Sequence, residues 1–119
     1  MADDDFCYLT TTGRRSGRPH EIEIWFAADD ERPCTLYLLA GAGRSSDWVR
    51  NLEADAACTV RVGRREAEPQ PAHGRVIGPG DAEDAAARRL VFAKYQPRTG
   101  GDLTSWRETA LPVAIDLGP

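Results

Sequence analysis

Two adjacent arginines and a serine lie between two glycines near the amino terminus, in the segment Gly13-Arg14-Arg15-Ser16-Gly17. Glycine lets the backbone turn tightly and expose its N–H groups, and guanidinium groups form charge-assisted hydrogen bonds with phosphate oxygens. The segment therefore suits a phosphate group or a polyanionic chain. The alternative is a solvated basic hairpin tip, and the spacing matches neither a Walker loop nor a GxGxxG fingerprint.

Outside this segment, few side chains could do chemistry by themselves. No Ser-His-Asp or Cys-His arrangement typical of nucleophilic catalysis is visible. Cys7, Cys34 and Cys58 are odd in number, far apart and without a CxxC pair. They indicate reduced strand residues, with Cys34 and Cys58 in the core, and no metal site is expected.

The composition is that of an ordinary globular chain. The 119 residues are 41% hydrophobic, enough for one domain over residues 1–119, with residues 1–5 disordered or forming a short N-terminal arm. The net charge of −4 argues against nucleic acid as a partner. Lys94 is the only lysine among 15 basic residues, a bias typical of a GC-rich, actinobacterial-like genome. No signal peptide and no apolar run of about 20 residues is visible, so we expect no transmembrane segment and a cytoplasmic location.

Apolar alternation and turn residues predict a mostly β fold. The expected strands cover residues 6–12, 20–28, 34–40, 57–62, a less regular stretch within 66–77, and 111–117. A short helix that ends at Asp55 and a longer one that Asp81 caps lie between them, and a glycine-rich loop over 96–104 is a candidate lid. About six antiparallel strands and two helices predict a small β-barrel whose openings are plugged by helices.

Two features predict a homodimer. The run from Cys34 to Ala40 is apolar on both faces, so both faces need cover from a helix or from another subunit. Trp25 lies on the polar face of the preceding strand, beside Glu21 and Glu23. A small barrel that exposed these surfaces would carry a large apolar patch, which a second copy would bury.

Several segments resemble one known family, in the right order along nearly the whole chain from Phe6. They are Thr10-Thr11-Thr12-Gly13-Arg14-Arg15-Ser16-Gly17, then Ser46-Asp47-Trp48-Val49-Arg50-Asn51-Leu52, Val60-Arg61-Val62-Gly63, Lys94-Tyr95, Trp106 and Pro112-Val113-Ala114-Ile115. On these residues the chain resembles the deazaflavin-dependent nitroreductase family. Its members are split β-barrel oxidoreductases related to flavin-binding pyridoxamine-phosphate-oxidase-like proteins, so the resemblance implies a split β-barrel of the FMN-binding-protein-like kind.

The resemblance implies reduced coenzyme F420, an 8-hydroxy-5-deazaflavin with a phosphate and an oligoglutamate tail, as the cofactor. It assigns the phosphate to the arginine segment and the deazaflavin ring to the backbone of residues 40–43, with support from the following helix. His20 stands where many relatives have a further arginine. The cofactor-binding residues that the resemblance implies are Gly13, Arg14, Arg15, Ser16, Gly17, His20, Ala40, Gly41, Ala42, Gly43, Asp47, Trp48, Arg50 and Asn51.

The resemblance implies no catalytic residue from the protein, because the cofactor delivers the hydride and the protein mainly orients the ring against a substrate. The implied substrates are small electron-poor acceptors: quinones, enones and activated nitro compounds. The expected acceptor pocket contains Trp25, Tyr95 and Trp106. Two alternatives stay open, namely an FMN-binding oxidoreductase of the same fold and a non-catalytic protein that binds a flavin, a deazaflavin or an amphipathic ligand.

Overall fold

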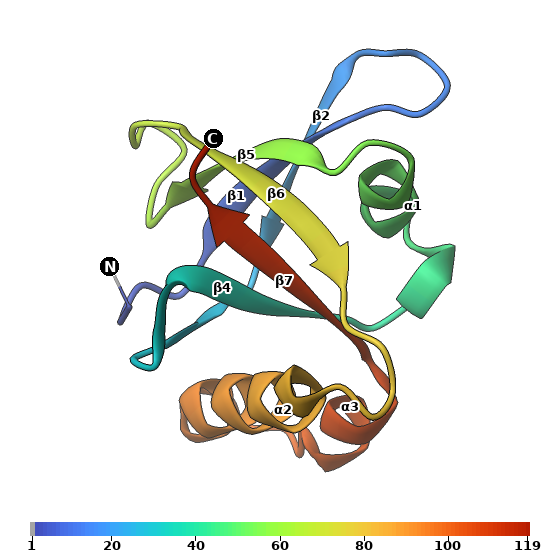
Figure 1. The fold of residues 1–119 in the computed structure, drawn as a ribbon. Helices are drawn as coiled ribbons and strands as arrows, with labels where there is room; N and C mark the ends of the chain where they lie inside the picture. The colour runs from blue at the N-terminus through green and yellow to red at the C-terminus, as the bar shows by residue number, and fades with distance from the viewer. Residues whose placement is uncertain (1) are drawn as a thin grey trace.

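The computed structural model describes residues 2–119 and shows one curled antiparallel sheet with three α-helices (Figure 1). The strands are β1 (Cys7–Thr12), β2 (Pro19–Ile24), β3 (Ala27–Asp29), β4 (Arg32–Ala40), β5 (Ala57–Val62), β6 (Gln70–Val76) and β7 (Leu111–Leu117). The helices are α1 (Asp47–Ala54), α2 (Ala82–Tyr95) and α3 (Thr104–Thr109), with 3-10 turns η1 (Gly43–Ser45) and η2 (Gln96–Arg98). The mostly β prediction is confirmed.

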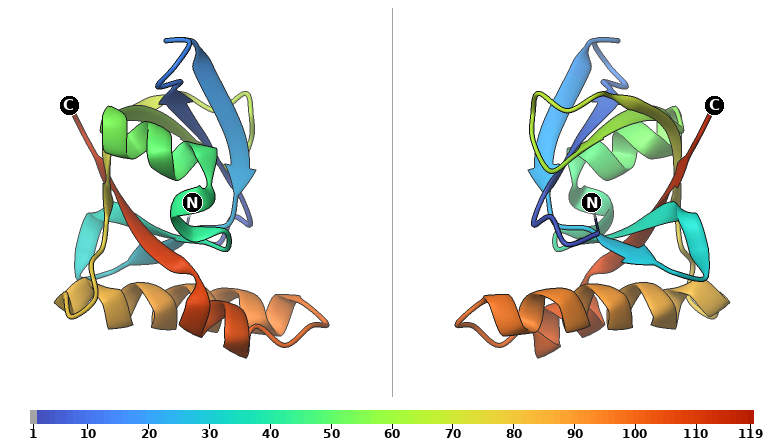
Figure 2. Two further views of the ribbon diagram at one scale, coloured as in Figure 1. Left: turned by 90° about the vertical axis from the view of Figure 1, so that its right-hand side faces the viewer. Right: turned by 90° about the vertical axis from the view of Figure 1, so that its left-hand side faces the viewer.

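The sheet order is β2-β1-β5-β6-β7-β4-β3, so β2 and β3 are its two edges. These edge strands are also consecutive in the chain, and only Trp25 and Phe26 join them. Because this connection is so short, the two edge strands must lie close together at that point, and the sheet curls into a barrel (Figure 2). In the same views α1 lies at the barrel interior, whereas α2 and α3 lie outside it.

The expected single strand over residues 20–28 is wrong, because the chain turns a corner at Trp25 and Phe26. At this corner the Phe26 N–H donates to the Tyr95 hydroxyl at 3.0 Å, and the Phe26 carbonyl accepts from Lys94 Nζ at 2.9 Å. Side chains of α2 thus replace the hydrogen bonds of a neighbouring strand. The described residues therefore form seven strands, one more than expected.

Helix α3 is a second departure from the sequence prediction, which gave two helices. Its N-cap residue, Leu103, makes no side-chain capping bond, and the helix is too short for a periodic pattern. The available signal was Asp102, whose carboxylate accepts a hydrogen bond from the Thr104 N–H at 2.9 Å. The predicted cap of α2 is confirmed, because the Asp81 side chain accepts from the Glu83 N–H.

The barrel interior holds one apolar core. Helix α1 completes it with Val49 and Leu52, and the backbone of Gly74 approaches so closely that a Cβ there would lie 2.7 Å from the Leu52 side chain. The buried members are Cys7, Leu9, Phe26, Leu36, Leu38, Ala40, Val49, Leu52, Cys58, Val60, Ala72, Val113 and Ile115. Cys34 is exposed at the start of β4, so the prediction that it lies in the core is wrong, whereas Cys58 is buried.

A second apolar core lies between the outer face of the sheet and α2. It joins Tyr37 and Leu39 of β4 to Val91 and Tyr95 of α2. Strand β4 therefore has the two-sided cover that its sequence predicted. Because that cover comes from the barrel interior and α2, this strand does not itself require a second subunit.

A polar network fixes the beginning of α2 to the sheet. Arg75 of β6 donates to Glu83 at 2.8 and 3.1 Å and to Asp116 at 2.7 and 3.2 Å. The Tyr37 hydroxyl donates to Glu83 at 2.6 Å. The hydrogen bonds from Arg75 lower the pKa of both carboxyls below their usual values, and burial followed by the bond to Glu83 raises the pKa of Tyr37.

The amino-terminal residues are attached to the far end of α2. Lys94 Nζ donates to the Asp4 carbonyl at 2.6 Å, and the Tyr95 hydroxyl lies 2.7 Å from the Asp5 carbonyl. Arg98 binds the Asp5 carboxylate at 2.6 Å. Met1, the first residue of the expected arm, lies outside the described residues. In residues 2–119 we find no helix with the length and apolar character that a membrane span requires.

The first prediction concerns the network at the start of α2. Glu83→Gln removes the charge that Arg75 and Tyr37 contact, and it should lower the free energy of unfolding at neutral pH by about 1.5–3 kcal/mol, as for hydrogen bonds to charged groups. The folded-state pKa of Glu83 is lowered. The stabilisation is therefore present above the unfolded-state pKa of about 4.3 and is lost as the pH falls through the folded-state value.

Urea unfolding of both proteins between about pH 7 and pH 3 measures this effect. The difference between parent and Glu83→Gln should shrink toward the acid end. Glu108→Gln is the control, because its ion-pair partner within residues 2–119, Arg107, lies 3.6 Å away and such a surface pair contributes less than about 1 kcal/mol. A difference that stays constant with pH would contradict the assigned role of the Glu83 carboxylate.

Candidate functional site

The arginine segment forms the loop of the β1–β2 hairpin. The Gly13 N–H donates to the Arg18 carbonyl and the Gly17 N–H to the Gly13 carbonyl, both at 2.8 Å. Gly17 has a φ of 73°, which glycine adopts without strain. At Gly13 a Cβ would lie 2.6 Å from His20 Nε2 and 2.7 Å from Ser16 Oγ. Gly17 is therefore required by its backbone conformation, whereas a side chain at Gly13 would displace the exposed side chains of Ser16 and His20.

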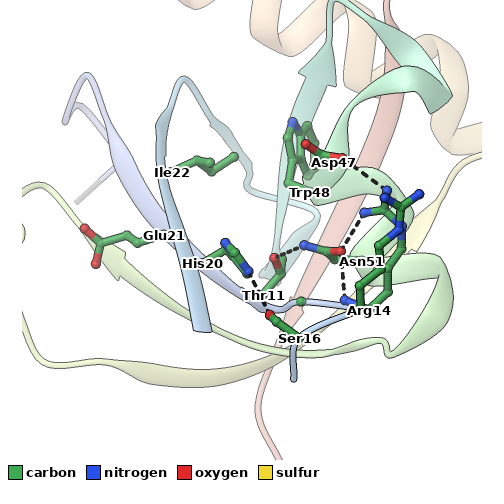
Figure 3. A pocket seen from close by; sticks show the side chains of 11 residues that line it. Thr11, Arg14, Ser16, His20, Glu21, Ile22, Asp47, Trp48 and Asn51 are labelled. Atoms are coloured by element: carbon green, nitrogen blue, oxygen red, sulfur yellow. Dashed lines mark hydrogen bonds and ion pairs between the residues drawn. The ribbon is translucent and has the colours of Figure 1, made fainter. Parts of the chain in front are cut away.

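Arg14 connects this loop to α1. Its backbone N–H and its Nη1 both donate to Asn51 Oδ1, at 3.2 and 2.9 Å. Asn51 Nδ2 donates in turn to the Thr11 hydroxyl of β1 at 3.2 Å. Asn51 is only 4% exposed and Thr11 only 1% exposed, so this amide joins the loop, α1 and β1 in the protein interior (Figure 3).

A carboxylate also contacts Arg14, on the solvent side. Arg14 Nη2 donates to Asp47 Oδ1 at 3.1 Å. The Asp47 side chain is 85% exposed, whereas that of Arg14 is 20% exposed. Asp47 can therefore turn into solvent at little cost, while Arg14 remains attached to Asn51.

The other two arginines of the loop are available to a ligand. Arg15 and Arg18 are exposed, and within residues 2–119 neither guanidinium has a hydrogen-bond or ion-pair partner. The Arg18 backbone N–H donates to Ser16 Oγ at 3.1 Å, and Ser16 Oγ lies 3.4 Å from His20 Nε2. The loop thus presents two unpaired positive charges on a compact backbone turn.

A cavity of about 490 Å³ opens beside this loop, between β2 and α1. Figure 3 shows His20 and Ile22 of β2 on one side and Trp48 and Asn51 of α1 on the other. Its lining residues are Thr11, Gly13, Arg14, Arg15, Ser16, His20, Glu21, Ile22, Asp47, Trp48 and Asn51. Positive charge at one end and an apolar wall beyond it suit an amphipathic ligand with an anionic group.

The structure brings most of the expected cofactor residues together at this cavity. They come from two distant parts of the chain, the β1–β2 hairpin and α1. Thr11, Glu21 and Ile22 also line the cavity, although the sequence did not single them out. The signal for Ile22 is the alternation of apolar and polar residues in the sequence of β2, which puts Ile22 on the face opposite Glu21 and Glu23. The expected residues that do not line the cavity are Gly17, Ala40, Gly41, Ala42, Gly43 and Arg50. Arg50 instead donates from Nε to the Arg44 carbonyl at 2.9 Å.

The three expected acceptor-pocket residues form an aromatic cluster away from the cavity lining. Trp25 stacks on Tyr95 with ring centroids 4.2 Å apart, and Trp106 meets Trp25 edge-on at 5.8 Å. Tyr95 is 1% exposed, and burial raises its pKa to about 12. Trp106 borders the end of β4, because a Cβ on Gly41 would lie 3.5 Å from the indole Nε1. The pocket role of these residues stays a prediction.

A family model described as F420H(2)-dependent quinone reductase matches residues 1–117. The chain belongs to this family. Its cofactor is coenzyme F420, which confirms the cofactor expected from the resemblance. The residues present fit that cofactor, because Arg14 and the unpaired Arg15 offer donors to a phosphate at the cavity and Trp48 and Ile22 offer an apolar wall.

Solved structures with the same fold are similar to this one. An F420-H2 dependent reductase, FDR-A, shares 18% identity with a TM-score of 0.69, and the match covers 96% of this chain and 94% of that one. A putative 5-nitroimidazole antibiotic resistance protein from Bacteroides thetaiotaomicron shares 13% identity with a TM-score of 0.70, over 98% and 74% of the chains. A FAD-binding protein from Mesorhizobium loti shares 14% identity with a TM-score of 0.65, over 99% and 84%. These matches confirm the split-barrel fold of the family.

One curated protein is also similar over part of its length. N-succinylglutamate 5-semialdehyde dehydrogenase from Erwinia tasmaniensis is 35% identical over 81 residues, which is 66% of this chain. The chain spans only 15% of that enzyme.

The second prediction concerns the exposed carboxylate on Arg14. Asp47→Asn removes a negative charge from the anion end of the cavity, so the affinity for coenzyme F420 should rise by about two- to fivefold, in line with the strength of exposed ion pairs. Quenching of F420 fluorescence during titration measures the dissociation constant. Asp30→Asn is the control, because it removes one charge from a turn that does not line the cavity. A lower affinity in Asp47→Asn would show that Asp47 itself binds the cofactor.

Proposed function

We propose that this chain is an F420H2-dependent reductase that transfers hydride to a small electron-poor acceptor, with quinones as the first candidate and enones and activated nitro compounds after them. The observation that carries the proposal is the hairpin loop, whose Arg14 and unpaired Arg15 line one end of the cavity between β2 and α1. Family membership supports the cofactor, and the description of the family favours a quinone as acceptor.

The residues divide the work of binding. The arginines of the loop would hold the phosphate and the first part of the anionic tail, with backbone N–H groups beside them. Trp48 and Ile22 would contact the ring system from the two sides of the cavity. Residues 40–43, which run from the last residue of β4 to the first of η1, would place their backbone along the ring. When bound, F420H2 supplies the hydride, so the protein needs only to orient donor and acceptor.

The acceptor would enter beside the aromatic cluster. Trp25 and Trp106 are partly exposed, and Trp106 adjoins Gly41 at the end of β4. The glycine-rich stretch 96–104 leads into α3, which carries Trp106. Small and polar residues in this stretch would leave a wide pocket, which favours quinones and enones over bulky nitro compounds. Tyr95 supports this wall from the interior, through its stacking on Trp25.

We also propose that the chain forms a homodimer in the cytoplasm. A solved structure described as a domain-swapped dimer is similar in fold, with a TM-score of 0.69 and 18% identity. Strand β2 is an edge strand that pairs only with β1, so its outer side can accept another strand. The three cysteines are free, which is consistent with a reducing compartment.

The third prediction tests the cofactor and its anchor. Purified protein should quench F420 fluorescence on titration and should not bind FMN at comparable concentrations. Arg15→Ala should weaken F420 binding about tenfold, because a charge-assisted hydrogen bond contributes about 1.5–3 kcal/mol. Arg89→Ala is the matched control, since Arg89 is exposed on α2 and does not line the cavity. Binding of FMN alone would favour a flavin enzyme of this fold, and binding of F420 without turnover of any acceptor would favour a carrier.

The fourth prediction tests the acceptor wall. Trp106→Ala should change the KM for a quinone, an enone and a nitro compound by different factors, while F420 affinity stays within about twofold, because Trp106 does not line the cavity. Trp106→Phe should restore most of the parental selectivity. Tyr95→Ala is a less direct test, because removing so large a buried side chain costs about 3–5 kcal/mol of stability. Unchanged rates on all three acceptors in Trp106→Ala would rule out this wall.

A further inference from the structure

The carboxamide of Asn51 contacts the arginine loop and the barrel interior at the same time. We propose that Asn51 is a positioning residue for the anion end of the site, which holds the Arg14 guanidinium at the cavity and affects cofactor affinity through Arg14 rather than by touching the cofactor. The inference rests on the proposed function for its ligand. It rests on the structure alone for the hydrogen bonds that it invokes.

The orientation of this amide is determined by its partners. Asn51 Oδ1 accepts two hydrogen bonds from Arg14, one from the backbone N–H and one from Nη1. If the amide were flipped, its NH2 group, which can only donate, would face the two N–H donors of Arg14. The NH2 group must therefore face Thr11, whose hydroxyl accepts a hydrogen bond from it at 3.2 Å. Because Asn51 and Thr11 are both buried, losing either partner leaves a polar group without a replacement from solvent.

The choice of an amide preserves the charge of Arg14. Asparagine accepts hydrogen bonds as a carboxylate would, but it adds no negative charge beside the site. Only one N–H from each of Nη1 and Nη2 is used, by Asn51 and Asp47, so the guanidinium keeps donors for an anion. Arg14 lines the cavity. Because its side chain already loses its rotamer freedom on folding, ligand binding does not bear that entropy cost.

The arrangement also separates the roles of the arginines. Arg14 is fixed by two side chains of α1, whereas the guanidinium groups of Arg15 and Arg18 have no partner in residues 2–119. A ligand therefore meets one oriented guanidinium and two adjustable ones. If Asn51 acts through Arg14, removing both residues should cost no more affinity than removing Arg14 alone.

A double-mutant cycle tests this directly. Asn51→Ala and Arg14→Ala should each raise the dissociation constant of F420 about tenfold, and the double variant should match Arg14→Ala. In steady state, Asn51→Ala should raise the KM for F420H2 with kcat retained at saturating cofactor. The comparison cycle pairs Asn51→Ala with Arg15→Ala, whose effects should multiply. Multiplying effects in the Asn51 and Arg14 cycle would overturn the proposal.

A second pair of variants tests the same hydrogen bonds with smaller changes, in case Asn51→Ala fails to fold. Thr11→Val matches the shape of threonine but cannot accept from Asn51, whereas Thr11→Ser keeps the hydroxyl. Thr11→Val should weaken F420 binding and speed hydrogen exchange at the Arg14 amide, and Thr11→Ser should restore both toward the parental values. Equal behaviour of the valine and serine variants in both measurements would overturn the proposal.

The outcomes separate this inference from the proposed function. If the parent protein binds F420 and Asn51→Ala binds it equally well, the inference fails while the function stands. If the parent protein does not bind F420, the proposed function fails, and inorganic pyrophosphate then serves as the probe. Chemical-shift changes at the loop amides that pyrophosphate induces in the parent and not in Asn51→Ala would uphold the inference, and equal changes in both would overturn it.

Discussion

Strand β4 is buried on both faces, with Leu36 and Leu38 in the barrel interior and Tyr37 and Leu39 under α2. This burial fixes the end of β4, and with it the position of the η1 turn and helix α1 that follow. The strand ends at Ala40, η1 turns the chain, and α1 then begins at Asp47 with its buried face directed into the barrel. Because α1 enters the interior core, its polar residues are carried to the β1–β2 hairpin.

The site is positively charged, whereas the chain as a whole is negatively charged. The protein carries a net charge of −4, yet the hairpin loop holds three arginines. Within residues 2–119, Arg14 is the one whose guanidinium is paired, and its charged partner Asp47 is the more exposed of the two. Several arginines elsewhere are paired with carboxylates, as with Arg75 between Glu83 and Asp116. The loop therefore concentrates positive charge that attracts a small anion on an otherwise acidic chain.

Much of the fold could be predicted from local pattern. Strands β5 and β7 occupy the residues expected from apolar alternation, and Asp81 caps α2 as its side-chain type indicated. The corner at Phe26 could not be predicted this way, because the groups that bind its backbone come from Lys94 and Tyr95, far along the chain. Local propensity carries no information about such a partner.

In the site too, local features could be predicted from the sequence, whereas features that depend on distant partners could not. Glycine spacing and adjacent arginines identified the loop, since a turn and its charges are local properties. The role of Thr11 was hidden, because a threonine in a strand is ordinary and only the fold brings Asn51 against it. The exposure of Cys34 was hidden as well. The apolar run of β4 suggested burial throughout, but the first three residues of the strand, 32–34, are exposed.

The attachment of residues 3–5 to the end of α2 has a consequence for how the fold forms. The bonds of Lys94 and Tyr95 to this segment span 90 residues of sequence, and that of Arg98 to Asp5 spans 93. Closing so long a loop is entropically costly, and contacts of this separation slow folding. These bonds therefore belong to the slow, long-range part of folding, in contrast to the local pairing of the β1–β2 hairpin.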